Sequence, residues 1–499
     1  MNAAPLEQLE DLALLIKAHH PLILLETSDD QRASKLLEHL ADRHNLPYFQ
    51  WQEHKGLARK GPGQKAIYGT AGPTQALDHL ASSDLEALYH FRDFLTQLDR
   101  SEIIARIKDL HQTFFTHRAA LILTGAQADL PQELASLFTT VKLRPPSERE
   151  YHHYLNNLLR DLRQRMPIAV ELDQAGVNRL IRALRGLSLL EVQKVITSAV
   201  AETQRFDDDT LDRVLKAKEE TIERSGVLEL FPTQNKLADV AGLDALKAWL
   251  RKRAKIFTDA DRARQFGLSA PKGILLLGVQ GCGKSLCAKA VAAEWKLPLV
   301  KLDPSNLYQK YVGESEKNLK RAIDTAEAMA PIVLWIDEIE KAFGQSNGED
   351  GGVSSRIFGT LLSWMQDKQA EVFVIATSNN ISVLPPELLR KGRFDEIFFV
   401  DLPKPHVRRQ ILDLHICRRG HSVNALDLDA LANLTEGFSG AELEQAVVSA
   451  LYAAFAEDRP LDQSHLVAEI KATHPLSVTM AEKIQALRSW AQGRAVFAD

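Results

Sequence analysis

The sequence is poor in features that would mark a secreted or membrane-spanning protein. Its 499 residues include 3 cysteines, Cys282, Cys287 and Cys417. They are too few for a disulfide framework and fit no zinc-binding spacing. No run of about 18 apolar residues occurs, so we expect no membrane-spanning helix. The first residues, MNAAPLEQLEDLALLIK, place acids where a signal peptide needs basic residues. These absences favour a cytoplasmic protein.

An excess of charge of one sign is lacking as well. The formal net charge is -5, from 61 basic and 66 acidic residues. This weak acidity argues against a protein that covers nucleic acid or anionic membrane with a broad basic surface. Apolar residues make up 45% of the chain, which is ample for separate hydrophobic cores. Length and composition together predict a soluble chain of about two to four domains.

A phosphate-binding pattern is present in the second half. Residues 273–290, GILLLGVQGCGKSLCAKA, join an apolar stretch, a glycine-containing turn and an alanine-rich stretch. The turn fits G-x-x-x-x-G-K-[ST], in which glycines let backbone N–H groups point at phosphate oxygens. Lys284 is suited to the β- and γ-phosphates and Ser285 to Mg²⁺. The residues predicted to bind nucleotide are Gly278, Val279, Gln280, Gly281, Cys282, Gly283, Lys284, Ser285 and Leu286.

Two acids end the next strongly apolar stretch. In IVLWIDEIEKAF, residues 332–343, Asp337 and Glu338 follow a predicted buried strand, at the end where open α/β sheets bind ligands. We expect Asp337 to hold Mg²⁺ through water, and Glu338 to polarise the water that attacks ATP. A further predicted strand, residues 372–376, is followed by Asn379. This side chain is suited to orienting water near the γ-phosphate, with an ordinary turn-forming role as the alternative.

Residues 236 to about 475 resemble one module of the AAA ATPase family. The motifs that carry the resemblance, besides the phosphate loop and the acidic pair, are LADVAGLDALKAWL (237–250), LLRKGRFDEIFFVDLP (388–403) and GFSGAELEQAVVSAL (437–451). In the last of these, Gly440 and Ala441 stand where other AAA+ groups carry a sensor arginine. That arginine is also absent from the subgroup of membrane-protein extractors, proteasomal ATPases and microtubule-severing enzymes. The sequence departs from the family at Val279 and Gln280, which replace a proline-rich loop start, and at Lys391, which replaces a proline.

This resemblance implies roles that the residue pattern alone leaves open. It places Ala241 and Gly242 near the adenine and makes Asn379 the first sensor. It makes Arg390 and Arg393 arginine fingers, that is, side chains that reach the nucleotide bound to a neighbouring subunit. The residue pattern alone is equally consistent with two ordinary surface arginines. Such fingers imply a homo-oligomeric ring, usually a hexamer, with ATP and Mg²⁺ as cofactors.

A second resemblance concerns Tyr311, Val312 and Gly313. Within LYQKYVGESEKNLKRAIDTA, residues 307–326, they match the aromatic–apolar–glycine loop that lines the pore of rings that thread polypeptides. The alternative is an ordinary half-buried tyrosine. Cys282 also has two interpretations: a thiol whose pKa is lowered by the following helix N-terminus and which serves redox control, or a small filler residue.

The sequence pattern indicates that the first half is a degenerate repeat of the second. LILLETSDDQRASKLL (22–37) can be laid on GILLLGVQGCGKSLCA (273–288), which puts Glu26 and Arg32 roughly where Gly278 and Lys284 stand. The stretch ALYHFRDF puts Arg92 at the position of the magnesium-binding acid. These substitutions remove phosphate and metal ligands, so we predict an AAA-like domain without a nucleotide site. Two unrelated α/β domains are the alternative.

The predicted fold is therefore α/β, with a parallel sheet flanked by helices and a helical lid in each half. Its overall layout is similar to that of two-domain AAA proteins of cyanobacteria, other bacteria and plastids that are known as hypothetical chloroplast reading frames. The expected boundaries are 1–145 for the degenerate domain, 146–205 for its helical region, 206–235 for a connecting helix ending near Pro232, 236–402 for the ATPase core, 403–475 for the lid and 476–499 for a final helix.

Two functions are compatible with these features. One is an ATPase ring that remodels or threads an unidentified protein partner. The other is a regulatory scaffold whose assembly with a partner is controlled by ATP binding. A nucleic-acid partner is disfavoured by the net charge of -5.

Overall fold

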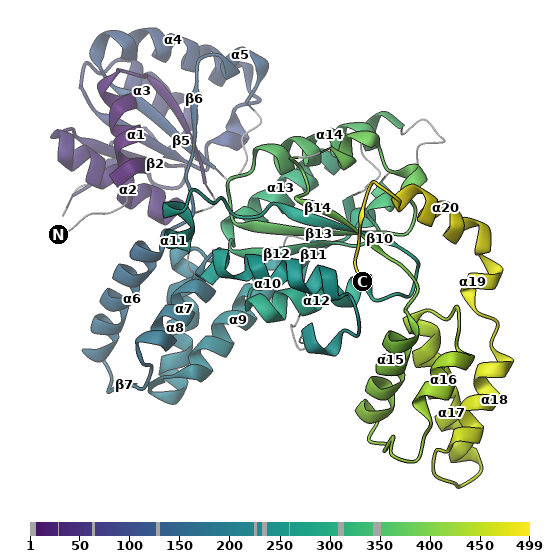
Figure 1. The fold of residues 1–499 in the computed structure, drawn as a ribbon. Coiled ribbons are helices and arrows are strands. Elements are labelled where there is room, and N and C mark those ends of the chain that lie inside the picture. Colours follow the sequence, from purple (N-terminus) through teal and green to yellow (C-terminus); the bar gives the residue numbers. More distant parts are fainter. Residues whose placement is uncertain are drawn as a thin grey trace. The chain divides into compact units, whose positions relative to one another are not determined.

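The computed structural model describes residues 6–27, 29–61, 65–125, 130–223, 227–231, 237–258, 260–307, 314–342, 351–390 and 392–499. The chain divides into two compact units, Met1–Lys218 and Glu219–Asp499, and each unit is described here by itself (Figure 1). Across these described ranges, no helix has the length and apolarity needed to cross a membrane.

The first unit is built on a sheet with strand order β3-β2-β4-β5-β1-β6. Strand β1, next to the edge strand β6, pairs in parallel with β6 and with β5, and β4 and β2 continue the parallel sheet beyond β5. Only β3 at the edge runs antiparallel, to β2. The strands are β1 (Leu22–Glu26), β2 (Tyr48–Gln52), β3 (Gly56–Arg59), β4 (Leu88–Arg92), β5 (Ala120–Gly125) and β6 (Thr139–Lys142).

Helices cover both faces of this sheet and bury its apolar side chains. Two cores result, one between the sheet and helices α1 and α2, the other between the sheet and helices α3 and α4. The helices of this α/β part are α1 (Leu6–Lys17), α2 (Asp30–His44), α3 (Pro73–Ala81), α4 (Ser101–His117) and the short α5 (Gln132–Ala135), with a 3-10 turn η1 (Leu95–Gln97).

A helical region completes the first unit and has its own core, which includes Tyr151, Leu184 and Ile196. Its elements are α6 (Glu148–Arg163), β7 (Ala169–Val170), α7 (Gln174–Leu184), α8 (Leu189–Thr203), β8 (Arg205–Phe206) and α9 (Asp208–Glu223). The boundary between the two units falls within α9.

Five strands of the second unit repeat the strand order of the first. Its sheet has the order β15-β14-β10-β13-β12-β11-β9, in which β10 lies in parallel between β13 and β14, as β1 lies between β5 and β6. The strands are β9 (Leu228–Phe231), β10 (Gly273–Gly278), β11 (Leu299–Leu302), β12 (Ile332–Ile336), β13 (Val372–Ser378), β14 (Glu396–Val400) and β15 (Val496–Phe497). This shared strand order supports the prediction of an internal repeat.

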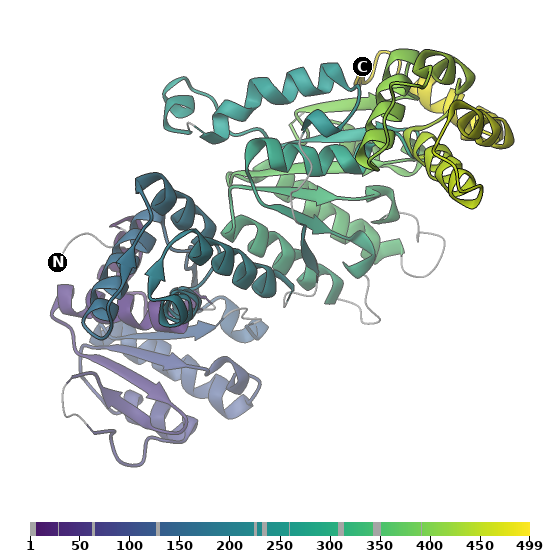
Figure 2. The ribbon, with the colours of Figure 1, turned by 90° about the horizontal axis from the view of Figure 1, so that it is seen from below.

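Helices on the two faces of the second sheet enclose two large cores (Figures 1 and 2). One face is covered by α10 (Asp244–Thr258) and α12 (Lys284–Trp295), the other by α13 (Glu314–Ala328) and α14 (Gly351–Asp367). Short elements complete this part: α11 (Ala260–Gln265), η2 (Leu237–Asp239), η3 (Pro304–Leu307), η4 (Ile339–Ala342), η5 (Ile381–Val383) and η6 (Pro386–Leu389).

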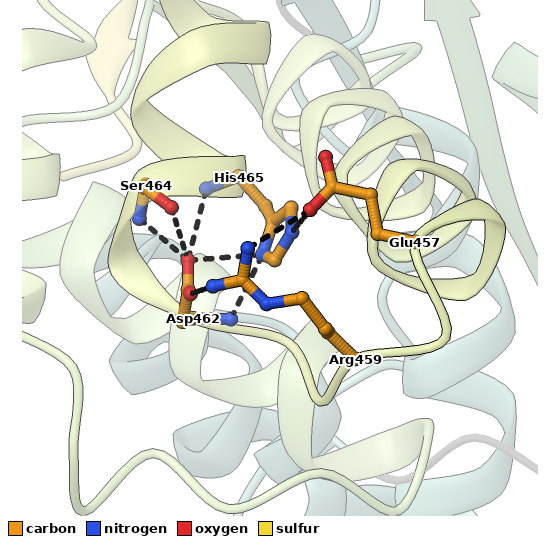
Figure 3. A network of polar contacts seen from close by, with 5 residues as sticks. All are labelled: Glu457, Arg459, Asp462, Ser464 and His465. Carbon is orange, nitrogen blue, oxygen red and sulfur yellow. Dashed lines mark hydrogen bonds and ion pairs between the residues drawn. The ribbon is translucent and has the colours of Figure 1, made fainter.

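The predicted helical lid follows the sheet. It consists of α15 (Pro405–Arg418), α16 (Leu428–Leu434), α17 (Gly440–Ala456) and α18 (Gln463–Ala472) around a common apolar core. A polar network closes the turn between α17 and α18 (Figure 3). There the Asp462 carboxylate caps α18, accepting from the N–H groups of Ser464 at 2.8 Å and His465 at 3.2 Å. Arg459 pairs with both Asp462 and Glu457.

The segments on either side of the ATPase module differ from the predictions. The connecting helix expected over 206–235 ends at Glu223, and residues 228–231 form β9, which pairs antiparallel with β11. A sheet edge offers unpaired N–H and C=O groups, and the apolar stretch Leu228–Phe231 occupies them. After the lid, α19 (Leu476–Thr479) and α20 (Ala481–Ala491) lead to β15, a strand that the sequence did not predict.

Ile484, Leu487 and Trp490 form an apolar stripe at helical spacing, and the sequence pattern favours its packing on the lid or on a neighbouring subunit. Instead, Leu487 and Trp490 pack with Leu277 and Phe399 of the core sheet, and Ile484 is buried. Arg488 fixes this position, because its guanidinium donates to both carboxylate oxygens of Asp401 at 2.8–3.0 Å.

Candidate functional site

The predicted strand–loop–helix arrangement is present at residues 273–290. The loop starts at Gly278, the last residue of β10, and ends at Gly283, which has a φ of 85° and precedes α12. Gly278 has a φ of 154°, and a Cβ there would lie 2.0 Å from the carbonyl oxygen of Val400. No larger residue fits at this point, so the close approach of β14 and the tight curl of the loop both depend on glycine.

Lys284 is held inside this loop. Its side chain is 6% exposed, and its Nζ donates to the carbonyl oxygens of Gly278 at 2.9 Å and Val279 at 2.7 Å. Burial lowers the pKa of this ammonium group to about 8. The cation therefore lies inside the loop, and its hydrogen bonds can be exchanged for stronger ones to the oxygens of a phosphate group.

A hydroxyl and a carboxylate lie side by side at the start of α12. Ser285 Oγ donates to Asp337 Oδ1 at 3.1 Å, although the two residues are far apart in sequence. The same Asp337 oxygen accepts from Thr377 Oγ1 at 2.7 Å. Oxygen ligands of this kind, next to a phosphate loop, suit Mg²⁺, which keeps most of its waters and takes one or two protein ligands. The donor set therefore fits the predicted metal site.

Glu338 and Asn379 also meet at this edge of the sheet. Asn379 Nδ2 donates to Glu338 Oε1 at 3.1 Å, and the other Glu338 oxygen pairs with Lys341. Glu338 has a φ of 49°, in the left-handed region that non-glycine residues seldom adopt. Strain of this kind is typical of residues held in place for function. The geometry thus brings together the predicted base and the predicted sensor.

Sequence reasoning missed two residues that hold this arrangement. Thr377 bridges the acids, since its Oγ1 donates to Asp337 and accepts from the backbone N–H of Glu338 at 3.0 Å. Glu340 accepts the backbone N–H of Asn379 at 2.8 Å. The available signal was weak: Thr377 is a polar residue near the end of an otherwise apolar strand, on the strand that neighbours the acidic pair.

The lid closes over the phosphate loop. The N–H of Ala441, in the first turn of α17, donates to the Gly281 carbonyl at 2.9 Å. Of the remaining loop residues, Val279 is buried, Gln280 is exposed and Leu286 is half-buried. The expectation of a low pKa for Cys282 is wrong, because burial raises the pKa of this thiol to about 12 and outweighs the neighbouring Lys284 and the hydrogen bond to the Gly440 backbone. The thiol is thus protonated, as expected of a filler residue.

The other predicted residues lie away from these contacts. Arg390 is exposed and Arg393 is half-buried on the stretch between β13 and β14. Arg393 donates to the Glu387 carbonyl, and among the described contacts neither arginine reaches the acidic pair of its own chain. Tyr311, Val312 and Gly313 fall outside the described residues.

In the first unit, the chain's own side chains fill the equivalent position. Arg32 is 5% exposed and its Nη2 donates to both oxygens of Glu150, at 3.0 and 3.3 Å. Asp29 accepts from the N–H of Arg32 at 3.1 Å and from the N–H of Leu189 at 3.3 Å. A carboxylate therefore occupies the helix N-termini of α2 and α8, where a phosphate would be favoured. Arg92 ends β4 and pairs with Asp30 at 3.4 Å.

Comparisons with known proteins agree with this architecture. The family model for the ATPase family associated with various cellular activities (AAA) matches residues 274–402, and that for the AAA+ lid domain matches 425–468. The first part of the chain matches the SpoVK-like AAA ATPase N-terminal domain over residues 8–143 and the SpoVK-like AAA ATPase second domain over residues 149–225. Core, acidic pair and lid thus define a nucleotide-binding protein of the AAA class.

Relatives over the whole length make the assignment more specific. The chain is 35% identical to the uncharacterized AAA domain-containing protein ycf46 of Trieres chinensis, over 97% of this chain and 96% of the relative. It is 35% identical to that of Pyropia yezoensis, over 97% and 98%, and 34% identical to that of Guillardia theta, over 97% and 94%. The chain belongs to the AAA ATPase family and, within it, to the ycf46 AAA domain proteins.

Proposed function

We propose that this protein is a Mg²⁺-dependent ATPase that works as a homo-oligomeric ring and remodels a protein partner in the cytoplasm. The observation that supports the proposal is the convergence of Lys284, Ser285, Asp337, Glu338 and Asn379 at the ends of three neighbouring strands. Each side chain is of the type that ATP hydrolysis needs at that place.

The residues divide the work of hydrolysis as follows. Lys284 and the N–H groups of the phosphate loop bind the phosphates, and the loop of Val240, Ala241 and Gly242 lies near the base. Ser285 and Asp337 would hold Mg²⁺, which neutralises charge on the phosphates when bound. Glu338 accepts a proton from the attacking water, and Asn379 orients that water and the Glu338 carboxylate.

The ring explains why Arg390 and Arg393 do not reach the acidic pair of their own chain. As fingers, they would stabilise the charge that develops on the γ-phosphate bound to the next subunit. We therefore expect the hydrolysis rate per chain to rise with protein concentration, and Arg393→Ala to lower it about 100-fold or more while ATP binding persists. Steady-state phosphate release across a wide concentration range measures both. A rate per chain that is independent of concentration would contradict the ring.

Threading is the proposed form of remodelling, and it rests on the sequence of Tyr311, Val312 and Gly313. We expect an unfolded polypeptide to stimulate hydrolysis, and Tyr311→Ala to remove this stimulation with basal hydrolysis intact, because the aromatic ring would grip the substrate rather than the nucleotide. The measurement compares hydrolysis with and without polypeptide, with Tyr308→Ala as the matched control. Stimulation that survives in Tyr311→Ala would argue against threading.

A nucleotide-gated scaffold is the second candidate. The filled position at Asp29 and Arg32 favours it, because a unit that needs no nucleotide to stay closed is available as a binding module. Cells that function equally well with wild-type protein and with Glu338→Gln would point to this alternative, since only ATP binding would then be required.

A further inference from the structure

The loop of residues 240–243 forms an unusual entrance to α10. Gly242 has a φ of 63° and Leu243 a φ of 57°, so two consecutive residues adopt the left-handed conformation just before the helix. A helix N-terminus leaves its first four N–H groups without intrahelical partners, and a side chain just before the helix normally accepts one of them. Neither glycine nor leucine offers such an acceptor.

The acceptors come from the end of the sequence. Asp499 Oδ1 accepts from the N–H groups of Leu243 and Asp244, the latter at 3.4 Å. The carbonyl oxygen of Ala498 accepts from Ala245 at 3.0 Å and Leu246 at 3.2 Å. These four consecutive N–H groups are therefore satisfied by two residues more than 250 positions away. The Asp499 carboxylate also carries the charge that a helix N-terminus favours.

The position of these two residues is fixed by the core sheet. Strand β15 pairs with β14, with Val496 beside Phe398 and Phe497 beside Phe399. The N–H of Ala498 donates to the Phe399 carbonyl at 2.9 Å, and Ala498 itself is 1% exposed. Asp499 is thus placed against the start of α10 by hydrogen bonds to the same sheet that carries the phosphate loop.

The entrance to α10 lies between the phosphate-loop helix and the lid. Leu237, Val240 and Leu243 share a core with Cys287 and Ala288 of α12. On the other side, a Cβ at Gly242 would lie 2.9 Å from both Asp499 Oδ1 and a methyl group of Val407 on lid helix α15. Arg418 of the same lid helix pairs with Asp239 at 3.3 Å. Under the proposed function, the base of a nucleotide whose phosphates occupy the loop lies at this junction.

We propose that Asp499 is a positioning residue for the nucleotide base: with Ala498, it fixes the loop of residues 240–243 and thereby sets the affinity for the adenine half of ATP. This inference rests on the proposed function, because it assumes that ATP binds with its base at this loop. Asp499 acts through the backbone of Leu243 and Asp244 and makes no contact with the phosphate loop in the contacts described.

The test separates the base from the phosphates by comparing ATP with inorganic tripolyphosphate as ligands of the full chain. In Asp499→Ala, we expect ATP to bind about fivefold to tenfold more weakly, consistent with the loss of a helix cap, and tripolyphosphate to bind as in wild type. Asp499→Asn should restore ATP binding to within about twofold, because an asparagine oxygen caps a helix as well as aspartate does. Hydrogen exchange at the amides of residues 243 and 244 should be faster in Asp499→Ala only.

Four other outcomes would contradict the positioning role, the location of the base or the proposed function. Unchanged ATP affinity in Asp499→Ala would overturn the positioning role and leave the proposed function standing. An equal loss for ATP and tripolyphosphate would also overturn it, because the cause would then be a general loss of structure. If wild-type protein binds tripolyphosphate but shows no preference for ATP, the base does not lie at this loop. If it binds neither ligand, the proposed function itself fails, and this inference with it.

Discussion

Replacing Lys284 with alanine is expected to weaken ATP binding about 100-fold or more and to reduce hydrolysis to background. The reason lies in the contacts of the ammonium group, which is buried in the loop and donates to Gly278 and Val279. With ATP bound, the same donors would serve phosphate oxygens, and two charge-assisted hydrogen bonds of about 1.5 kcal/mol each correspond to about two orders of magnitude in affinity. Equilibrium binding of a fluorescent ATP analogue measures the first effect, and phosphate release the second.

Lys289→Ala is the matched control for this prediction. Lys289 lies on the same helix but extends over the rings of Phe231 and Trp335, at 5.0 and 5.6 Å. Its removal deletes a lysine from α12 without changing the loop, so ATP binding should stay within about threefold of wild type. Circular dichroism should show both variants folded. Undiminished ATP binding by a folded Lys284→Ala variant would exclude the loop as the nucleotide site.

Replacing Glu338 with glutamine is expected to leave ATP binding intact and to slow hydrolysis by a factor of about 100 to 10,000, the usual contribution of a general base. Glutamine keeps the shape of the side chain and an oxygen that can accept from Asn379 Nδ2, but it cannot take a proton from water. Single-turnover hydrolysis with a parallel binding measurement distinguishes the two effects. ATP should therefore accumulate unhydrolysed on the variant and stabilise the proposed ring.

The neighbouring acid provides the control. Glu340 also contacts Asn379, through the backbone N–H rather than the side chain, and an amide oxygen in Glu340→Gln can still accept that bond. We expect this variant to lose less than about tenfold in hydrolysis. If Glu340→Gln is inactive and Glu338→Gln retains activity, then the two roles have been assigned to the wrong residues.

The sequence predicted the parts of the site that depend on local pattern. The apolar stretches 274–277 and 332–336 were predicted as buried strands, and the glycines, lysine and acids at their ends are recognised by their spacing. The structure places these residues at the ends of β10 and β12, which lie on either side of β13. The repeat was also visible, because strand–turn–helix segments recur in the two halves, and five strands of each sheet share one order.

Predictions failed where a local rule competed with burial or with a distant partner. A helix N-terminus lowers the pKa of a solvated thiol, and the sequence therefore predicted a low pKa for Cys282. Burial of this thiol raises its pKa instead. Residues 228–231 continue an amphipathic helical pattern, yet β11 offers them a free strand edge. The stripe on α20 was recognised as apolar, but periodicity does not tell which surface will cover it, and the core strands β10 and β14 do so.

The sequence by itself determined which strands carry the site, which turn can hold phosphate and which acids can act beside it, because these properties depend on neighbours within a few residues. Only the tertiary structure decided which distant groups supply the remaining hydrogen bonds of these segments. Asp29 accepts the first N–H of α8 from 160 residues away, and Asp499 accepts the first N–H of α10 from 255 residues away. The physical reason is that a buried or terminal N–H group needs an acceptor but does not specify one. The acceptor is the oxygen atom that the tertiary fold places within hydrogen-bonding distance of that N–H group.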